Sequence, residues 1–429
     1  MKERIALVAG LRTPFCKAGG QIKHMKADEL GAVAVRELMA RLNIDDQMLD
    51  ELIVGNVAMP GDAANIARIV GLKAGLRQDL IAYTVHRNCA SGMEAITTAA
   101  NKILAGEAEI IMAAGTESMS HIPLLFNRKA TAWFEKLARA RTFGQRLGVM
   151  LGWRPSFMSP IIGVKLGLTD PVCGLNMGET AEVLARDFHI TRHDQDAFAL
   201  ESHQRACRAQ AAGVFAEESV PLMVAPDYQK RIEADDGPRP QQSLEALGKL
   251  RPVFNRDTGT VTAGNACPLT DGAAAMLVMR ESKAKELGLE PLGYLRDYAY
   301  AALAGTRMGL GPVYATAKLL AKTGGSMSDF QRIEINEAFA AQAIACGKAY
   351  GSDEYAKTHL NRDKAVGELD WSITNVNGGA IALGHPVGTT GMRLVLTLLH
   401  ELRRSNNQRG LATLCIGGGQ GAALDLEVA

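Results

Sequence analysis

Cys89 lies in the stretch NCASG, residues 88–92, where an apolar run gives way to a helical pattern. A cysteine at a helix N-terminus is favoured as a reactive thiolate, because the helix dipole and the free N–H groups stabilise its negative charge. A structural cysteine, in contrast, is usually buried as a small hydrophobic side chain. The stretch alone leaves both interpretations open.

A histidine with unusual surroundings lies near the C-terminus. The stretch NVNGGAIALGHPVGTTG (375–391) places His385 between Gly384 and Pro386, directly before a helix start made of small residues. Its five glycines indicate that backbones approach something closely there; they are Gly378, Gly379, Gly384, Gly388 and Gly391. A lone histidine is more often structural than catalytic, so this stretch also needs support from the rest of the chain.

Two further stretches could stabilise negative charge on an oxygen atom. In ATLCIGGGQGAA, Cys415 ends a predicted strand and three glycines follow at 417–419, whose backbone N–H groups could bind an oxyanion. In EINEAFAAQ, Asn336 and Glu337 lie where a strand turns into a helix. The Asn336 amide there either orients a water or a carbonyl group, or it caps the helix.

The elements that must position these residues follow from the hydrophobic pattern. Short runs rich in Val, Ile and Ala alternate with longer helical patterns, which predicts an α/β fold with a largely buried sheet. The predicted strands are 4–10, 51–57, 109–115, 273–279, 291–300, 332–337 and 410–417. The predicted helices are 28–42, 91–105, 178–187, 194–212, 312–323, 337–350 and 388–403.

An internal repeat indicates two similar halves. Residues 30–56 align with residues 311–337 without a gap, and in each a helix, a turn and a short acidic stretch lead into an apolar strand. The repeated order predicts two α/β halves that meet near residue 285. We therefore expect an N-terminal half of residues 1–119 plus 251–285, a helical and loop-rich insertion of residues 120–250, and a C-terminal half of residues 286–429.

The first part of the predicted insertion is basic and aromatic. Residues 126–168 hold eight Lys and Arg residues against Glu135 alone, a local charge of +7, together with six aromatic residues. Such a helical segment suits a membrane surface or an anionic partner. A solvated helical arm packed within an oligomer is an equally good interpretation.

Composition sets the broad class. The 429 residues are 47% hydrophobic and 22% charged with a net charge of +1, which is ordinary for a soluble protein and gives no support to nucleic-acid binding. Seven widely spaced cysteines without a CxxC pair fit a reducing compartment. We find no signal or transit peptide and no membrane-spanning run, so we expect a cytoplasmic protein. His189 and His193 lack a third ligand, so no metal site is predicted.

In this order along the chain, the four stretches closely resemble the thiolase family. The matching motifs are NCASG, NEAF, GHPxGxxG and CxGGG, with RTPF (12–15) and VTAGNACPLTDGAAA (261–275) in addition. The resemblance covers nearly the whole chain. It implies duplicated α/β halves layered as α-β-α-β-α, with an insertion domain along which coenzyme A (CoA) lies.

The resemblance also implies a reaction. A thiolase cleaves a 3-ketoacyl-CoA with free CoA, or condenses two acyl-CoA molecules in reverse. Cys89 would be the nucleophile that forms a thioester, His385 would take its proton, and Cys415 would protonate the leaving enolate and then deprotonate the incoming CoA thiol. His385 and a water held by Asn336 would stabilise the enolate oxygen. The backbone N–H groups of Cys89 and Gly417 would form a second oxyanion pocket.

The family further indicates how the substrates bind. CoA is a co-substrate, and no permanently bound cofactor is expected. By this resemblance, pantetheine would be contacted by Ala263, Gly264 and Cys267. Met177 and Met308 would line the acyl pocket.

Departures from the family bear on the subfamily. Cys267 stands where serine is common, and Asn176 stands where short-chain acetoacetyl-CoA enzymes often have histidine. Either both are local variation, or they argue against a dedicated acetoacetyl-CoA enzyme. The basic insertion resembles the membrane-associating segment of thiolase subunits in trifunctional β-oxidation complexes, whereas NVNGGAIALGHP and ATLCIGGG resemble the short-chain biosynthetic branch.

The leading hypothesis is a 3-ketoacyl-CoA thiolase of fatty-acid β-oxidation that works through a Cys acyl-enzyme in a ping-pong mechanism. The alternative is an acetoacetyl-CoA thiolase (acetyl-CoA acetyltransferase) working in the condensing direction. A third hypothesis is a non-catalytic lipid-transfer or scaffold subunit with a thiolase fold. As partners we expect acyl-CoA and CoA, a second copy of the chain in a homodimer or homotetramer, a hydratase/dehydrogenase subunit, and a peripheral membrane contact through residues 126–168.

Overall fold

The computed structural model describes residues 3–429. It divides into a larger unit, formed by residues up to 121 and residues 170–429, and a smaller unit of residues 122–169. The predicted insertion of residues 120–250 therefore spans both units. Its second part belongs to the larger unit because α7 (Met177–Asp187) and α8 (Arg192–Ala211) both pack on α12 (Ala340–Tyr350).

The strands of the larger unit repeat one pairing pattern. The first half has the spatial order β4 (Ile81–Val85), β3 (Glu51–Gly55), β5 (Ile110–Ser118), β10 (Thr270–Arg280), β1 (Ile5–Arg12). The second half has the order β12 (Arg332–Ile335), β13 (Arg409–Ile416), β14 (Gln420–Glu427), β11 (Gly293–Ala302). In both halves a parallel pair, β3 with β5 or β12 with β13, is followed by two antiparallel pairings. The shared pattern confirms the predicted duplication, and β1 pairs with β11 where the halves meet.

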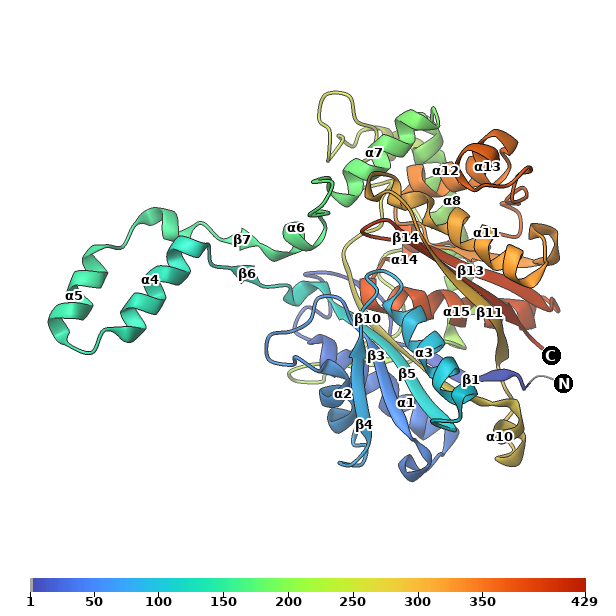
Figure 1. The fold of residues 1–429 in the computed structure, drawn as a ribbon, viewed down its shortest axis with the longest axis horizontal. Coiled ribbons are helices and arrows are strands. Elements are labelled where there is room, and N and C mark those ends of the chain that lie inside the picture. Colours follow the sequence, from blue (N-terminus) through green and yellow to red (C-terminus); the bar gives the residue numbers. More distant parts are fainter. Residues whose placement is uncertain (1–2) are drawn as a thin grey trace. The chain divides into compact units, whose positions relative to one another are not determined.

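Five layers result from this duplication. On the outside of the first half lie α1 (Ala27–Leu42) and α2 (Ile66–Ala74), and on the outside of the second lie α11 (Gly311–Thr323) and α12. Between the two halves lie α3 (Ser91–Ala105) and α15 (Val387–Arg404), which pack on strands of both (Figure 1).

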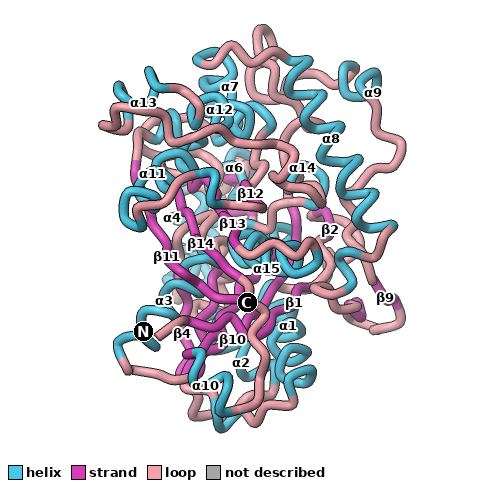
Figure 2. Tube along the Cα trace, turned by 90° about the vertical axis from the view of Figure 1, so that its right-hand side faces the viewer, coloured by secondary structure: helices cyan, strands magenta, loops and turns pink. Residues whose placement is uncertain are grey.

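Alternation of side chains along the strands joins neighbouring layers. Leu277 of β10 faces α1 and α2, whereas its neighbours Met276 and Val278 face α3 and α15. The strands are consequently enclosed by helices (Figure 2). These layers confirm the α-β-α-β-α arrangement.

The structure also differs from the predicted elements. The helix predicted from 337 begins at Ala340, because the segment before it is extended and bonds to the 265–267 loop through Ala340 N to Asn265 O (2.9 Å). Neither β4 nor β14 was predicted. β4 lies at the sheet edge and is partly exposed along its length, and β14 carries a buried Asp425 that pairs with Arg409. The remaining elements of the larger unit include β2 (Cys16–Lys17), β8 (Leu222–Val224), β9 (Lys230–Ile232), α9 (Leu244–Gly248), α10 (Glu281–Glu286), α13 (Asp353–His359) and α14 (Ala380–Leu383).

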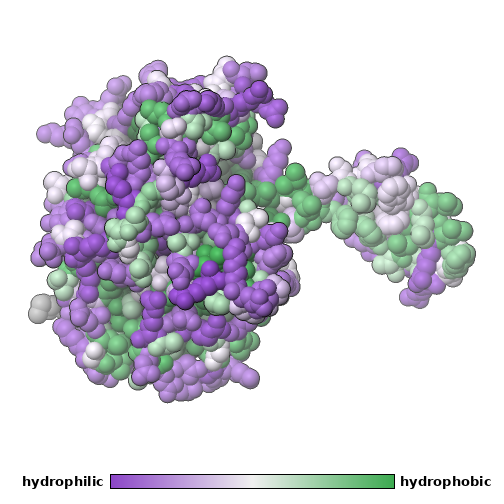
Figure 3. Space-filling model, turned by 180° about the vertical axis from the view of Figure 1, so that it is seen from behind, coloured by the Kyte–Doolittle hydropathy of each residue, from purple (hydrophilic) through white to green (hydrophobic). Residues whose placement is uncertain are grey.

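The smaller unit is a helical hairpin on a two-stranded stem. Its strands β6 (Leu124–Leu125) and β7 (Ile161–Ile162) pair antiparallel, and its helices are α4 (Arg128–Arg139), α5 (Phe143–Leu151) and α6 (Gly163–Gly167). The Trp133 indole donates a hydrogen bond to the Val149 carbonyl (2.7 Å), which joins α4 to α5. Many apolar side chains of this unit are exposed (Figure 3), among them Phe126, Phe134, Phe143, Leu147, Met150 and Leu151. Within residues 3–429, no helix has both the length and the apolar character needed to cross a membrane.

Candidate active site

A strained turn presents Cys89 at the start of α3. Asn88 adopts a left-handed conformation (φ +43°), which asparagine tolerates better than most residues. The Ser91 hydroxyl donates to the Asn88 carbonyl (2.8 Å) and accepts from the backbone N–H of Arg87 (2.9 Å), so the turn is held from both sides. The Asn88 amide donates to the Gly417 carbonyl (2.8 Å). The loop that carries Cys89 is therefore tied to the loop that follows Cys415.

The small residues after Cys89 allow α3 and α15 to touch through their backbones. A Cβ atom at Gly92 would lie 2.7 Å from the Met392 nitrogen, and one at Gly391 would lie 2.7 Å from the Met93 nitrogen. Because such separations are too short for carbon, only glycine fits at either position. The helix that follows Cys89 and the helix that follows His385 are thus fixed in direct contact.

His385 is buried, with 6% of its surface exposed, between α14 and α15. Its Nδ1 atom lies 2.6 Å from the Thr390 hydroxyl, and that hydroxyl donates its one hydrogen to the Pro386 carbonyl (3.0 Å). The hydroxyl must therefore accept from Nδ1–H, which leaves a lone pair on Nε2. Nε2 has no hydrogen-bond partner in the described part of the chain. Burial, assisted by the Arg393 charge, lowers the His385 pKa to about 4, so the ring is a neutral base at physiological pH.

Cys415 lies at the end of β13 and is 1% exposed. Burial raises its pKa well above the usual value, and the neighbouring thiols Cys89 and Cys267 add to this effect. Cys415 therefore carries its proton at neutral pH. Once deprotonated, it would be a strong base.

The environment of Cys89 is mixed. Burial raises its pKa, whereas the backbone N–H groups of Gly417 and of Cys89 itself face the sulfur and lower it. Burial has the larger effect, so the helix terminus alone does not produce a thiolate at rest. The cysteine needs a base, which His385 can supply. The two N–H groups are the pair that the sequence predicted as an oxyanion pocket.

Asn336 directly follows β12 and is fully buried. Its backbone N–H bonds to the Thr413 carbonyl (3.0 Å), which places it beside the strand that ends at Cys415. Both atoms of its side-chain amide lack a partner within residues 3–429. A buried amide with unused bonding capacity is suited to hold a water or a substrate carbonyl. It does not cap the following helix.

The loop around Cys267 joins the Asn336 segment to the His385 segment. The Cys267 N–H bonds to the Ala338 carbonyl (3.0 Å), and Leu269 forms a β-bridge with His385. Burial and the nearby Cys89 raise the Cys267 pKa to about 12.

The predicted acyl-pocket residues lie together. Met177 and Met308 share one apolar cluster with Cys415 and Cys267. A Cβ atom at Gly417 would lie 3.2 Å from the Met177 sulfur. Asn176 caps α7, since its side chain accepts from the Gly178 N–H (3.0 Å).

Ala263 and Gly264, predicted to contact pantetheine, lie earlier in the same loop. Ala263 is exposed, and Gly264 is buried against the side chains of Leu247 and Leu250, which a Cβ atom would overlap. Their position neither brings them into the apolar cluster nor assigns them a ligand.

Sequence reasoning missed two residues that support the site. Thr390 orients His385, and its signal in the sequence is only its place one helical turn after Pro386. Glu117, in the stretch GTESMS, bonds to the start of α15 (Gly388 N to Oε2, 2.9 Å). No pattern in the chain indicated that contact.

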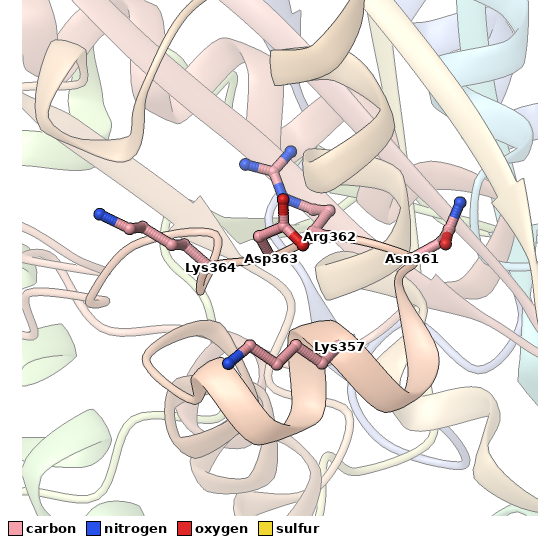
Figure 4. Close-up of a pocket in the computed structure, with 5 residues that line it drawn as sticks. All are labelled: Lys357, Asn361, Arg362, Asp363 and Lys364. Atoms are coloured by element: carbon pink, nitrogen blue, oxygen red, sulfur yellow. The ribbon is translucent and has the colours of Figure 1, made fainter.

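A surface pocket of about 580 Å³ lies elsewhere, beside α13 (Figure 4). It is lined by Lys357, Asn361, Arg362, Asp363 and Lys364, none of which belongs to the cluster around Cys89. Among residues 3–429, no three His, Cys, Asp or Glu side chains form a group suited to a metal ion.

Known proteins share both the fold and the whole length of this chain. Residues 5–282 match the family described as thiolase, N-terminal domain, and residues 289–428 match thiolase, C-terminal domain. The chain therefore belongs to the thiolase family, whose enzymes are acyltransferases.

The chain is similar over its whole length to individual thiolases. The chain is 42% identical over 427 residues to a 3-ketoacyl-CoA thiolase of Pectobacterium atrosepticum, covering 99% of this chain and 97% of that one. It is also similar to the crystal structure of the Bacillus anthracis acetyl-CoA acetyltransferase (TM-score 0.86, 36% identity, 100% and 99% covered). The human mitochondrial 3-ketoacyl-CoA thiolase in complex with CoA is similar too (TM-score 0.85, 35% identity, 100% and 98% covered).

Proposed function

We propose that this chain is a 3-ketoacyl-CoA thiolase that cleaves its substrate with CoA to acetyl-CoA and a shortened acyl-CoA. The observation that carries the proposal is the unpaired Nε2 of a neutral, buried His385. This residue directly precedes α15, the helix that touches the helix after Cys89. A base in that state removes a thiol proton, and the thiolate then attacks carbon.

The first half-reaction uses the two cysteines for different tasks. His385 Nε2 takes the proton of Cys89, and the sulfur attacks the 3-keto carbon. Collapse of the adduct breaks the C2–C3 bond and leaves an acyl thioester on Cys89. The departing carbanion takes the proton of Cys415, whose high pKa suits a donor to such a strong base. Protonated His385 and a water on Asn336 stabilise the enolate oxygen.

The second half-reaction restores the enzyme. The Cys415 thiolate removes the proton of the incoming CoA thiol, and the CoA sulfur attacks the thioester. The backbone N–H groups of Cys89 and Gly417 stabilise the oxyanion. Cys89 leaves as a thiolate and recovers its proton from His385, so every proton returns to its starting group.

CoA is proposed as a co-substrate, with pantetheine along the loop of Ala263, Gly264 and Cys267 and the acyl chain against Met177 and Met308. Support comes from the human relative, whose title names a complex with CoA, and from the apolar cluster that holds both methionines.

An acetoacetyl-CoA thiolase working in the condensing direction remains the second candidate, because one similar structure is an acetyl-CoA acetyltransferase. The names of the more similar sequence relatives favour the first. The two candidates can be separated by measuring rates of thiolysis over a series of 3-ketoacyl-CoA substrates with acyl chains of about 4 to 16 carbons. Activity confined to the four-carbon substrate would exclude the first candidate.

Cys89→Ser tests the chemistry itself. We expect no turnover and no acyl-enzyme by mass spectrometry, whereas the wild type mixed with a 3-ketoacyl-CoA carries an acyl group on Cys89. An acyl adduct on another residue would contradict the assignment. Absence of any adduct or turnover in the wild type would favour a lipid-transfer or scaffold subunit.

We also propose contacts for the surfaces outside the site. β4 is a partly exposed edge strand, which suits pairing with a second copy in a dimer or tetramer. Residues 126–168 combine the +7 charge with exposed apolar side chains, which suits an anionic membrane surface or a hydratase/dehydrogenase subunit of β-oxidation. We therefore propose a cytoplasmic enzyme that contacts the membrane peripherally through residues 126–168.

A further inference from the structure

Glu117 is a buried carboxylate at the end of β5, with 1% of its surface exposed. Four N–H groups point at its two oxygens. Oε1 accepts from the Ala58 backbone (3.0 Å) and the Asn56 amide (3.2 Å), and Oε2 accepts from the backbones of Gly388 (2.9 Å) and Val57 (3.2 Å). Within residues 3–429, Glu117 is the one side chain that bonds to the Gly388 N–H.

These donors come from two segments that lie far apart in the sequence. Residues 56–58 follow β3, and Gly388 is the second residue of α15, three positions after His385. Pro386, the residue before α15, provides no side-chain cap for the helix. The Glu117 carboxylate takes that role from the end of β5, and a negative charge there also suits the helix dipole.

Close packing makes this contact rigid. A Cβ atom at Gly388 would lie 3.0 Å from Glu117 Oε2 and 2.8 Å from the Thr116 carbonyl. One at Gly115 would lie 2.6 Å from the Gly388 carbonyl. The first turn of α15 therefore has a single place against the end of β5, and His385 directly precedes that turn.

The charge of Glu117 also reaches the nucleophile. Its field raises the pKa of Cys89, and burial raises its own pKa to about 7. Two other titratable groups act on Glu117 or feel its charge, namely Asp271 on β10, which raises the Glu117 pKa further, and Cys89 ahead of α3. Burial raises the pKa of Asp271 itself, although Ser120 and His121 partly oppose this. His385 lies ahead of α15, the helix whose start Glu117 binds.

We propose that Glu117 is a positioning residue that holds the start of α15, and with it His385, in register with Cys89. Its ionised form is the one that four N–H donors favour. When the carboxyl gains a proton, it loses charge-assisted bonds to both segments. This inference rests on the proposed function, in which His385 is the base for Cys89.

The test compares Glu117→Gln with the wild type. We expect kcat to fall at least tenfold at pH 8, because the glutamine NH2 group faces backbone donors. We also expect the acid limb of the pH–rate profile near pH 7 to flatten, because the variant has no carboxyl group to titrate there. Alkylation of Cys89 by iodoacetamide, measured against pH without substrate, should show a lower apparent pKa once the charge is gone. Slower turnover together with a lower apparent pKa of the Cys89 thiol is a combination that loss of folding alone does not produce.

Two further variants separate the effect of the Glu117 charge from a general effect on stability. Glu117→Asp retains the charge but shortens the reach to Gly388, so it should keep the Cys89 alkylation profile of the wild type and recover only part of kcat. Asp50→Asn is the matched control, because Asp50 accepts from the Glu109 and Ile110 N–H groups at the opposite end of β5. It should change thermal stability without moving either pH profile.

Turnover of Glu117→Gln within twofold of the wild type, or an unchanged alkylation profile, would overturn the inference. Failure of the proposed function would look different. In that case the wild type itself would form no acyl-enzyme on Cys89, whatever Glu117 does.

Discussion

The Thr390 hydroxyl lies 2.6 Å from Nδ1 of His385 and gives its own hydrogen to the Pro386 carbonyl. This arrangement fixes the imidazole tautomer from behind, because a hydroxyl that donates elsewhere can only accept from Nδ1–H. The lone pair is thereby kept on Nε2, the atom with no partner in the described chain.

Thr390→Val should therefore impair the base. The change keeps the shape but removes the acceptor, and loss of one such bond, about 1.4 kcal/mol, predicts a fall in kcat of about tenfold. The rate of Cys89 alkylation near neutral pH should fall as well. Thr389→Val is the matched control, since the Thr389 hydroxyl bonds to the Gly272 carbonyl and not to His385. Equal activity of the two variants would contradict the role of Thr390.

Cys415→Ala should slow both half-reactions while iodoacetamide still alkylates Cys89. In the proposed mechanism Cys415 moves protons and does not attack carbon, and loss of one positioned acid–base group costs on the order of 10²–10⁴-fold in rate. Stopped-flow measurement of acyl-enzyme formation and of its breakdown by CoA separates the two steps. Near-normal turnover would rule out the assigned role.

Gly92→Ala should damage the enzyme although the side chain gains only one methyl group. That methyl would meet backbone of α15, which cannot move aside as a side chain can, so we expect a loss of about 1–3 kcal/mol in unfolding free energy and a large drop in kcat. Gly144→Ala on α5 is the control, because open space surrounds that position. Denaturant unfolding of both variants measures the difference, and equal stability would show that the helices can separate freely.

Removal of the helical hairpin should separate surface binding from chemistry. The stem pairs Leu125 with Ile161, so residues 126–160 can be replaced by Asn-Gly, a favoured two-residue hairpin turn. Sedimentation with anionic vesicles should require anionic lipid, weaken in salt and largely vanish in the shortened protein, since each Lys or Arg near such a surface contributes roughly 1 kcal/mol. Thiolysis of short substrates should survive.

Charge reversal provides the control for the hairpin. Lys136→Glu with Arg139→Glu should reduce binding to vesicles, whereas Lys357→Glu with Arg362→Glu, in the basic pocket of the larger unit, should not. Equal sedimentation and equal recovery of partner subunits by the intact and shortened proteins would leave a solvated arm whose charge acts only on CoA phosphates.

The sequence allowed the duplication and the four site stretches to be predicted because each depends on local pattern. Residues 30–56 and 311–337 show the same periodicity, and both fold as helix, short turn and strand (α1 to β3 and α11 to β12). Cys89, His385, Cys415 and Asn336 lie at the strand ends or helix starts where the pattern changes.

Features that depend on distant partners could not be predicted. Glu117 reads as an ordinary polar residue after a strand, and only the fold brings Gly388 to it. Asn336 was expected either to hold a ligand or to cap a helix, and the extended segment up to Phe339 decided against the cap. The edge strand β4 was missed because its side chains are partly exposed and lack a clear alternating pattern. The limits of the hairpin unit, 122 and 169, follow from packing and not from composition.

The glycine contact between α3 and α15 divides the molecule into a part that evolution can adjust and a part that it cannot. At Gly92 and Gly391 any added carbon meets main chain, so exchange of a side chain there cannot adjust the spacing of the helices that follow Cys89 and His385. Under the proposed function, the walls that would face the acyl chain are built differently, from the side chains of Met177 and Met308 and from the loop around Cys267. Substitutions at these wall residues would therefore alter the proposed substrate pocket while the contact between α3 and α15 stays fixed by main-chain atoms.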